Sequence, residues 1–364
     1  MKIKIIRSKF LEGLKKVQNI VVGNSSMQII QNVLIETGDN EISMTTTDLD
    51  VSIRSKVTCE VVEEGGTTLP VKLLFETISK VAEGPVEIEV SDNNLATISA
   101  GSAVFKMAGM DRADFPALPS GSGTYSHSLP QAVLREMFRK TAYSASQDDS
   151  RRALKGVLMA FKENKLTMVA TDGRRLSLVE HEMEFPEEAQ LEIVLPIKVV
   201  SELQRVLASD GDVKITIEKT QAVFDLGSTQ IYSKLLSDPY PNYRQVIPDD
   251  YTERISVDRK LLLVALDRAS VMMTGEANST RLTFDSNELV VSSAAHDVGE
   301  ARDIVPIKYS GERLEIIFNP GYVMDCLKAI DDDEVFIELK SATMPAVIKC
   351  EAPFLYVIMP LRTN

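Results

Sequence analysis

Asp48 and Asp172 are the residues of this chain that come closest to a reactive pair. Two carboxylates held together can divide general acid and general base work, which would suit a hydrolase or a nuclease. Each aspartate, however, directly follows a threonine, Thr47 or Thr171, beside alternating apolar residues. Threonine and aspartate in this order are typical of turns whose side chains cap the backbone. We therefore favour turn caps over catalysis at these positions.

No other group of residues suggests chemistry. His127, His181 and His296 have no cysteine or carboxylate at the spacing of a metal site. The chain also contains neither the G-x-x-x-x-G-K-[ST] phosphate loop nor the G-x-S-x-G nucleophile elbow. We expect no catalytic residue, no metal and no cofactor.

The cysteines indicate the compartment. Cys59, Cys326 and Cys350 are odd in number, far apart and set among apolar residues. Buried free thiols in a reducing environment are favoured over disulfides. The chain has no pattern of a secretory signal and no run of about 18 apolar residues, so we expect a cytoplasmic protein.

The sequence repeats itself with a period of 124 to 125 residues. Asp48, Asp172 and Asp297 fall at one position of a predicted hairpin. A second set of markers keeps the period, since a proline ends a short apolar run at Pro70, Pro196 and Pro320. Such a period is too long for a solenoid repeat and matches a small domain.

We therefore predict an α+β fold with three tandem similar domains, at 1–123, 124–248 and 249–364. Each has two helices packed on antiparallel sheets, with apolar residues at helical spacing. The predicted helices are Ser8–Asn19, Val71–Ala82, Pro130–Tyr143, Ile197–Leu207, Asp258–Ser270 and Pro320–Ile330. The predicted hairpins are Val33–Val57, Leu154–Glu180 and Thr280–Val291, and Pro119–Gly123 is a predicted linker.

Charge is distributed unevenly between the helices and the rest of the chain. The net charge of the 364 residues is −13, which by itself argues against a nucleic-acid partner. The six predicted helices, however, carry 14 basic and 7 acidic side chains, or +7, which leaves −20 elsewhere. Helices that share one surface would make it mildly basic and suited to weak contact with a polyanion, although amphipathic helices often carry Lys and Arg for solubility alone.

Three short motifs carry a resemblance. These are Thr-Asp-Gly-Arg-Arg-Leu at 171–176, Asp-Pro-Tyr-Pro-Asn-Tyr at 238–243 and Tyr-Val-Ile-Met-Pro-Leu-Arg at 356–362. With the three-domain length, they resemble the bacterial DNA polymerase III beta subunits, the replicative sliding clamps. The resemblance implies a DNA polymerase processivity factor without enzymatic activity. It implies a head-to-tail homodimer that closes a ring around double-stranded DNA or a primer-template, with helices lining the ring and sheets outside.

The resemblance also implies a hydrophobic pocket for short peptides of partner proteins. The implied partners are the DNA polymerase III alpha subunit, the clamp loader, other polymerases and mismatch-repair proteins, with no membrane involved. The pocket residues are Leu154, Thr171, Gly173, Arg174, Arg175, Leu176, Pro241, Val246, Met344, Pro345, Val357, Met359, Pro360 and Leu361.

Two further sets of residues follow from the resemblance. Phe105 and Met107 would meet Val271 and Met272 of a second copy at the dimer interface. The DNA-facing residues would be Lys9, Lys15, Lys72, Lys80, Arg135, Arg139, Lys140, Gln147, Arg151, Arg152, Lys198 and Arg205.

Two alternatives stay open. A linear three-domain scaffold would bind peptides without encircling DNA. A hydrolase or nuclease would use Asp48 or Asp172, and Asp172→Asn would abolish a metal-dependent turnover.

Overall fold

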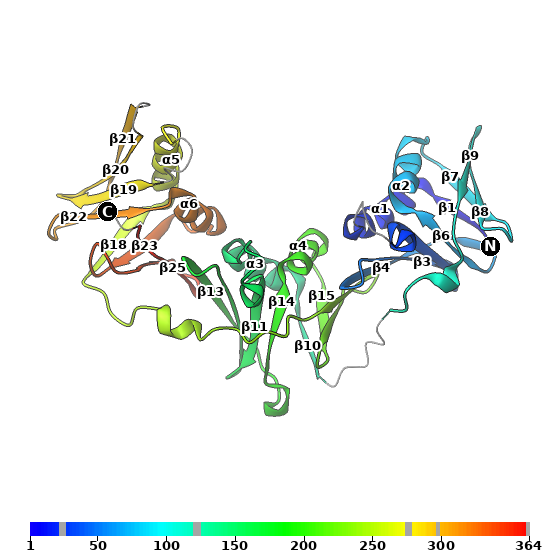
Figure 1. The fold of residues 1–364 in the computed structure, drawn as a ribbon, viewed down its shortest axis with the longest axis horizontal. Coiled ribbons are helices and arrows are strands. Elements are labelled where there is room, and N and C mark those ends of the chain that lie inside the picture. Colours follow the sequence, from blue (N-terminus) through cyan, green and yellow to red (C-terminus); the bar gives the residue numbers. More distant parts are fainter. Residues whose placement is uncertain (22–26, 119–124, 274–278, 296–298, 362–364) are drawn as a thin grey trace. The chain divides into compact units, whose positions relative to one another are not determined.

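The computed structural model describes residues 1–364 except 22–26, 119–124, 274–278, 296–298 and 362–364. The described residues form six α-helices and four antiparallel sheets (Figure 1). The predicted helices are confirmed, with ends that differ by at most two residues. They are α1 (Arg7–Val17), α2 (Val71–Lys80), α3 (Gln131–Thr141), α4 (Ile197–Val206), α5 (Arg259–Ser270) and α6 (Pro320–Ala329).

Two of the sheets have eight strands each. The first has the order β10 (Tyr125–Pro130), β15 (Asp212–Ile217), β16 (Gln221–Asp225), β17 (Thr229–Lys234), β4 (Val51–Thr58), β3 (Glu41–Thr47), β2 (Asn32–Thr37), β6 (Gly66–Pro70). The second has the order β14 (Leu191–Pro196), β11 (Gly156–Lys162), β12 (Lys165–Thr171), β13 (Arg175–Glu182), β25 (Phe354–Ile358), β24 (Ala346–Lys349), β23 (Glu334–Leu339), β18 (Glu253–Asp258).

The other two sheets have fewer strands. The five-stranded sheet has the order β5 (Glu60–Glu63), β1 (Lys2–Ile6), β7 (Pro85–Val90), β8 (Leu95–Ala100), β9 (Ala103–Ala108). The four-stranded sheet has the order β21 (Gly299–Pro306), β20 (Glu288–Ala295), β19 (Thr280–Asp285), β22 (Leu314–Phe318). Strands β9 and β21 each have one edge without a partner among the described strands.

The described chain divides into two compact units. One comprises Met1–Leu134 with Ser201–Leu235, and the other comprises Arg135–Val200 with Leu236–Asn364. This division differs from the three predicted domains because each eight-stranded sheet joins strands of two successive repeats, through β17 with β4 and β13 with β25. The α+β class with two helices in each repeat is confirmed, and the domain boundaries stay a prediction.

Each helix packs an apolar stripe against its sheet. In α1, Phe10, Leu14 and Val17 are fully buried, and the helix contacts β3, β4 and α2. Helix α5 contacts β20, β21 and α6 in the same way. Apolar residues at helical spacing therefore fix which face is buried, and the charged residues stay on the other face.

Some predictions made from the sequence differ from the structure or lie outside the described residues. The predicted hairpin Val33–Val57 contains three strands, β2, β3 and β4, because alternation marks a strand without marking where one strand ends and the next begins. Cys326 and Cys350 are buried free thiols, but Cys59 is only half-buried.

Pro119–Gly123, His296 and Asp297 lie outside the described residues. Among the described residues, no helix is long and apolar enough to cross a membrane.

Candidate functional site

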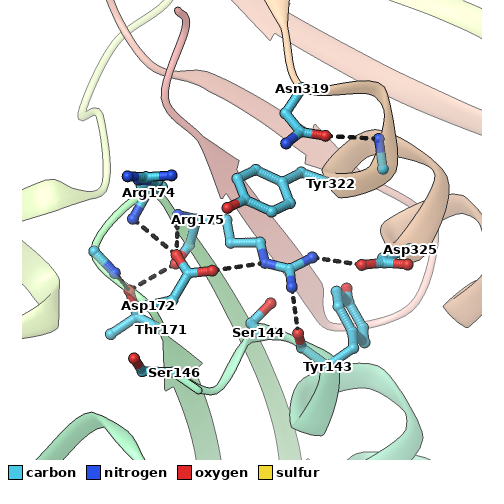
Figure 2. Close-up of polar contacts among 12 residues, drawn as sticks. Tyr143, Ser144, Ser146, Thr171, Asp172, Arg174, Arg175, Asn319, Tyr322 and Asp325 are labelled. Atoms are coloured by element: carbon cyan, nitrogen blue, oxygen red, sulfur yellow. Dashed lines mark hydrogen bonds and ion pairs between the residues drawn. The ribbon is translucent and has the colours of Figure 1, made fainter. Parts of the chain in front are cut away.

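The turn between β12 and β13 is capped by its own side chains (Figure 2). The Asp172 Oδ1 atom accepts the backbone N–H groups of Arg174 at 2.9 Å and Arg175 at 3.1 Å. The Thr171 hydroxyl donates to the Arg175 carbonyl at 2.6 Å and accepts the Gly173 N–H at 3.1 Å. These bonds occupy the carboxylate and the hydroxyl that sequence reasoning assigned to a turn.

The turn between β3 and β4 repeats this arrangement. The Asp48 Oδ1 atom accepts the N–H groups of Asp50 at 3.0 Å and Val51 at 2.7 Å. The Thr47 hydroxyl donates to the Val51 carbonyl at 3.1 Å and accepts the Leu49 N–H at 3.0 Å. The turn-cap prediction is confirmed at both positions, which leaves each aspartate with a structural role.

Arg175 is the centre of a polar network that sequence reasoning missed (Figure 2). Its guanidinium donates to Asp172 at 3.0 Å, to Asp325 of α6 at 2.6 Å and to the Tyr143 carbonyl at 2.6 Å. It also lies over the Tyr322 ring, 4.2 Å from the ring centre. The fork of donors thus ties the turn, α6 and the segment after α3 together. No motif connects these residues, since Asp325 is 150 positions from Arg175.

The electrostatics of the network follow from its burial. Burial of Arg175 is the largest single influence and lowers its pKa, but the hydrogen bond to Asp325 together with the nearby Tyr356 and Asp172 raises the pKa by more, so it is raised overall. Burial raises the pKa of Tyr143 well above its usual range. Both groups therefore keep their protons at neutral pH, and neither is a candidate general base.

A cavity of about 410 Å³ lies beside this network. It is lined by Gln147 and Arg151, which were predicted to face DNA, and by Arg174 and Arg175, which were predicted for the peptide pocket. Arg151 donates to the Asp172 carbonyl at 2.9 Å. The two predicted sets therefore meet at one turn. Tyr143, Ala145, Ser146, Asp148, Asp172 and Tyr322 complete the lining.

An apolar cluster lies on the sheet next to this turn. Leu176 and Val357 stand directly opposite each other on β13 and β25 and are buried in this cluster with Leu158, Val169 and Val194. The segment after β17 packs against them through Tyr240, Tyr243 and Ile247. Two of its predicted pocket residues, Pro241 and Val246, are exposed, and 50 % of the Val246 surface faces solvent. These contacts give a hydrophobic floor with an exposed apolar rim.

The end of the described chain lines a second cavity, of about 620 Å³. Met359, Pro360 and Leu361 form one wall, and Ile317 and Thr343 lie among the other residues. The Met359 N–H donates to the Arg174 carbonyl at 2.9 Å, so this wall continues directly from the turn. Arg281, Glu315 and Ala342 complete the lining, and sequence reasoning did not find them.

The predicted pocket residues therefore fall into three groups. Gly173, Arg174 and Arg175 form the turn, Leu176 and Val357 form the floor, and the terminal residues form a separate wall. Met344 is exposed and Pro345 is half-buried, while Leu154 is half-buried and Thr171 is buried. Neither of the two cavities contains Leu154, Leu176, Pro241, Val246, Met344, Pro345 or Val357.

Most of the predicted DNA-facing residues are exposed. The exposed members are Lys9, Lys15, Lys72, Lys80, Arg135, Gln147, Arg151, Arg152, Lys198 and Arg205. Arg139 is half-buried and pairs with Glu136 and Asp331.

Lys140 does not fit the prediction. The residue is only 8 % exposed, and its ammonium pairs with Glu136 at 3.1 Å. The helical spacing of Glu136 and Lys140, four residues apart, brings the two charges together. Lys140 is thus a buried partner of Glu136 and not an exposed cation.

Two of the predicted dimer residues, Phe105 and Met107, lie on the edge strand β9, and the other two, Val271 and Met272, directly follow α5. Phe105 is 37 % exposed on β9, and Val271, just after α5, is 73 % exposed. Met107 is 4 % exposed and belongs to the core of its own sheet, while Met272 is half-buried. Phe105 and Val271 thus keep part of their apolar surface exposed in one copy.

Family models match nearly the whole length of the chain. The N-terminal, central and C-terminal domain models of the DNA polymerase III beta subunit match residues 1–119, 128–242 and 244–362. The beta sliding clamp of Chlamydia pneumoniae is 32 % identical over 364 residues, which cover 100 % of both chains.

Solved structures agree with the family models. The DNA polymerase sliding clamp of Bacillus subtilis superposes with a TM-score of 0.96 at 28 % identity, covering 100 % of both chains. The sliding clamp of Bartonella birtlesii bound to griselimycin superposes with a TM-score of 0.96 at 30 % identity, also over 100 % of both chains.

Proposed function

Because this chain belongs to the DNA polymerase III beta subunit family, the sliding clamps that serve DNA polymerases as processivity factors, we propose that two copies close a ring around duplex DNA. The ring slides along DNA and tethers the replicative polymerase, without catalysis of its own. The three domains are 1–123, 124–248 and 249–364, and the protein acts in the cytoplasm.

The observation that carries the proposal is the pair of open sheet edges. Inside the chain, successive repeats are joined by strand pairing, β17 with β4 and β25 with β13. The equivalent strands at the two ends, β9 and β21, have no such partner among the described strands. When two copies associate head to tail, β9 of each copy can pair with β21 of the other, so both open edges gain a partner. The rotation that relates the two copies then closes the assembly into a ring.

The helices supply a surface suited to DNA. Exposed cations such as Lys15 on α1, Lys72 on α2 and Lys198 on α4 lie on helices with a net positive charge, in a chain that is acidic overall. A closed ring keeps DNA by topology, so it needs only weak phosphate contacts, and tight contacts would hinder sliding.

The apolar floor and the exposed apolar residues beside it supply the binding site that tethers partner proteins. The floor of Leu176 and Val357 and the exposed Val246 and Met359 suit a short peptide with apolar anchors. The bound griselimycin of the Bartonella birtlesii clamp supports a ligand site in this family. Its ligands in this protein would be segments of the polymerase III alpha subunit, the clamp loader, other polymerases and mismatch-repair proteins.

Retention on circular DNA tests the ring. Protein loaded onto nicked circular DNA should stay bound through gel filtration and be lost when one double-strand cut makes the circle linear, because it can then slide off the ends. Circular and linear DNA of the same sequence provide the matched comparison. Equal retention on both would favour the linear scaffold and overturn the ring.

A further inference from the structure

We propose that Arg281 binds an acidic side chain of the partner peptide, beside the apolar anchors that the peptide site holds. The proposal rests on the peptide site of the proposed function and adds a charge preference to it. The ligand is a segment of a partner protein with an aspartate or a glutamate within about three residues of its apolar anchors.

Arg281 continues the surface of the terminal wall, which Met359, Pro360 and Leu361 form. The Leu361 N–H donates to the Ile317 carbonyl at 2.8 Å, so the end of the described chain runs beside β22. Ile317 pairs directly with Arg281 on β19. Because paired residues of a sheet point to the same face, the two side chains are neighbours there. Both of them line the cavity of about 620 Å³ together with the terminal wall.

The distance from the terminal wall to Arg281 suits a short flank of a bound peptide. Neighbouring strands are about 4.8 Å apart, so Arg281 stands about 10 Å from Leu361 across β22. An extended peptide advances about 3.3 Å for each residue, so about three residues span this distance. A peptide that runs from the terminal wall across β22 therefore brings a flanking residue over Arg281.

Arg281 has only a loose ion-pair partner. Its Nη1 atom lies 3.5 Å from Oε2 of Glu315, whereas Nη2 of Arg313 lies 2.5 Å from Oε1 of the same carboxylate. Two guanidinium groups thus share one carboxylate, which leaves positive charge uncompensated at this place. The side chain of Arg281 is 50 % exposed, so its fork of donors is open to a second carboxylate.

The other charges nearby do not cancel this surplus. Among the described residues that line the cavity of about 620 Å³, only Arg281 and Glu315 are charged. A neighbouring cavity of about 570 Å³ also reaches Arg281, and its lining includes Asp285 and Glu288. Asp285 stands four residues after Arg281 on β19, about 13 Å away, and Glu288 pairs with Asp285. This exceeds the screening length of about 8 Å at physiological salt, so these two carboxylates weaken the preference little.

An apolar wall with one cation at its edge defines the class of ligand. Met359 and Leu361 are exposed and suit apolar anchors, while the guanidinium of Arg281 suits a carboxylate. A lysine at the same place in the peptide would meet a like charge and be disfavoured. The preference thus distinguishes partner segments that share the same anchors.

Fluorescence anisotropy of labelled peptides with capped ends measures this preference. Each peptide contains the core Gln-Leu-Ser-Leu-Phe, whose apolar side chains suit the floor, between two flanks of three serines. In further peptides one flank or the other is changed to aspartates or to lysines. At one of the two flanks, aspartates should lower the Kd about 5-fold relative to serines, and lysines should raise it about 5-fold.

Variants of Arg281 assign the preference to its side chain. Arg281→Gln should remove the difference between the flanks and leave the Kd of the serine peptide unchanged, and Arg281→Glu should reverse the order. Lys162→Gln is the matched control. Lys162 lies on β11, is 47 % exposed and pairs with Glu192, but it lines neither cavity, so the acidic preference should persist in this variant.

The outcomes separate the charge preference from the peptide site itself. Equal affinity for all flanks in the wild-type protein, or a preference that persists in Arg281→Gln, would overturn the role of Arg281 and leave the peptide site standing. A wild-type protein that binds none of these peptides would overturn both. Because the serine peptide reports an intact site, a misfolded variant would be recognised by its failure to bind that peptide.

Discussion

Leu49 and Gly173 occupy the same place in two capped turns that otherwise match bond for bond. Both residues have a positive φ, 78° for Leu49 and 85° for Gly173. Glycine adopts this conformation without strain, whereas a leucine Cβ crowds the neighbouring carbonyl. The first repeat therefore keeps the turn at a local cost that the second repeat avoids.

Replacing Leu49 with asparagine should stabilise the protein. Asparagine tolerates the left-handed region better than leucine, and Leu49 is 46 % exposed, so little packing is lost. We expect a gain of about 0.5 to 1 kcal/mol in the free energy of unfolding, measured by urea denaturation. Leu49→Ala also removes the apolar surface but lacks the short polar side chain that lets asparagine adopt the left-handed conformation, so it should gain nothing; an equal gain from both variants would attribute the effect to exposure alone.

At the scale of elements, Arg175 joins β13 to α6 and to the segment after α3. Without the Arg175 guanidinium, the carboxylates of Asp172 and Asp325 would lose the cation that they share, at a partly buried position. We expect Arg175→Ala to lower the free energy of unfolding by about 2 kcal/mol, and Arg175→Lys to lower it by about half as much, because lysine keeps the charge but loses the fork.

A double-mutant cycle isolates the bond to α6. If Arg175 acts through Asp325, the loss caused by Arg175→Ala should shrink by about 1 kcal/mol in an Asp325→Asn background. Equivalent losses in both backgrounds, measured by chemical denaturation, would mean that Arg175 contributes through Asp172, the Tyr143 carbonyl or the Tyr322 ring instead.

The elements also mark the limit of what the sequence predicts. Apolar spacing located all six helices, and the Thr171–Asp172 pair identified its turn, because both signals are local. The pairing of β17 with β4 and of β13 with β25 leaves no local signal, since alternation reports which face a strand buries and not its neighbour. For the same reason the contact of Arg175 with Tyr322 and Asp325 could not be anticipated from residues so far apart in the chain.

At the scale of the whole molecule, an acidic chain that encircles DNA needs cations on the surface that faces the DNA. The net charge of −13 repels a polyanion at long range, while helices α1 to α6 together carry 15 basic and 6 acidic side chains, or +9. A ring built this way binds phosphates weakly and keeps DNA by closure, so its direct affinity and its retention after loading should respond differently to lost cations.

Neutralising two exposed helix lysines separates these two quantities. Lys15→Gln with Lys72→Gln removes up to four cations from a dimer, and each phosphate contact contributes about 0.9 to the slope of log K against log salt. We expect the slope for direct binding to short duplex DNA to fall by about 2 to 4, while protein already loaded on nicked circles stays bound. Lys214→Gln with Lys219→Gln removes the same charge from exposed strand and turn positions and should leave the slope unchanged. An equal fall for both pairs would show that DNA responds to the total charge of the molecule and not to these helices.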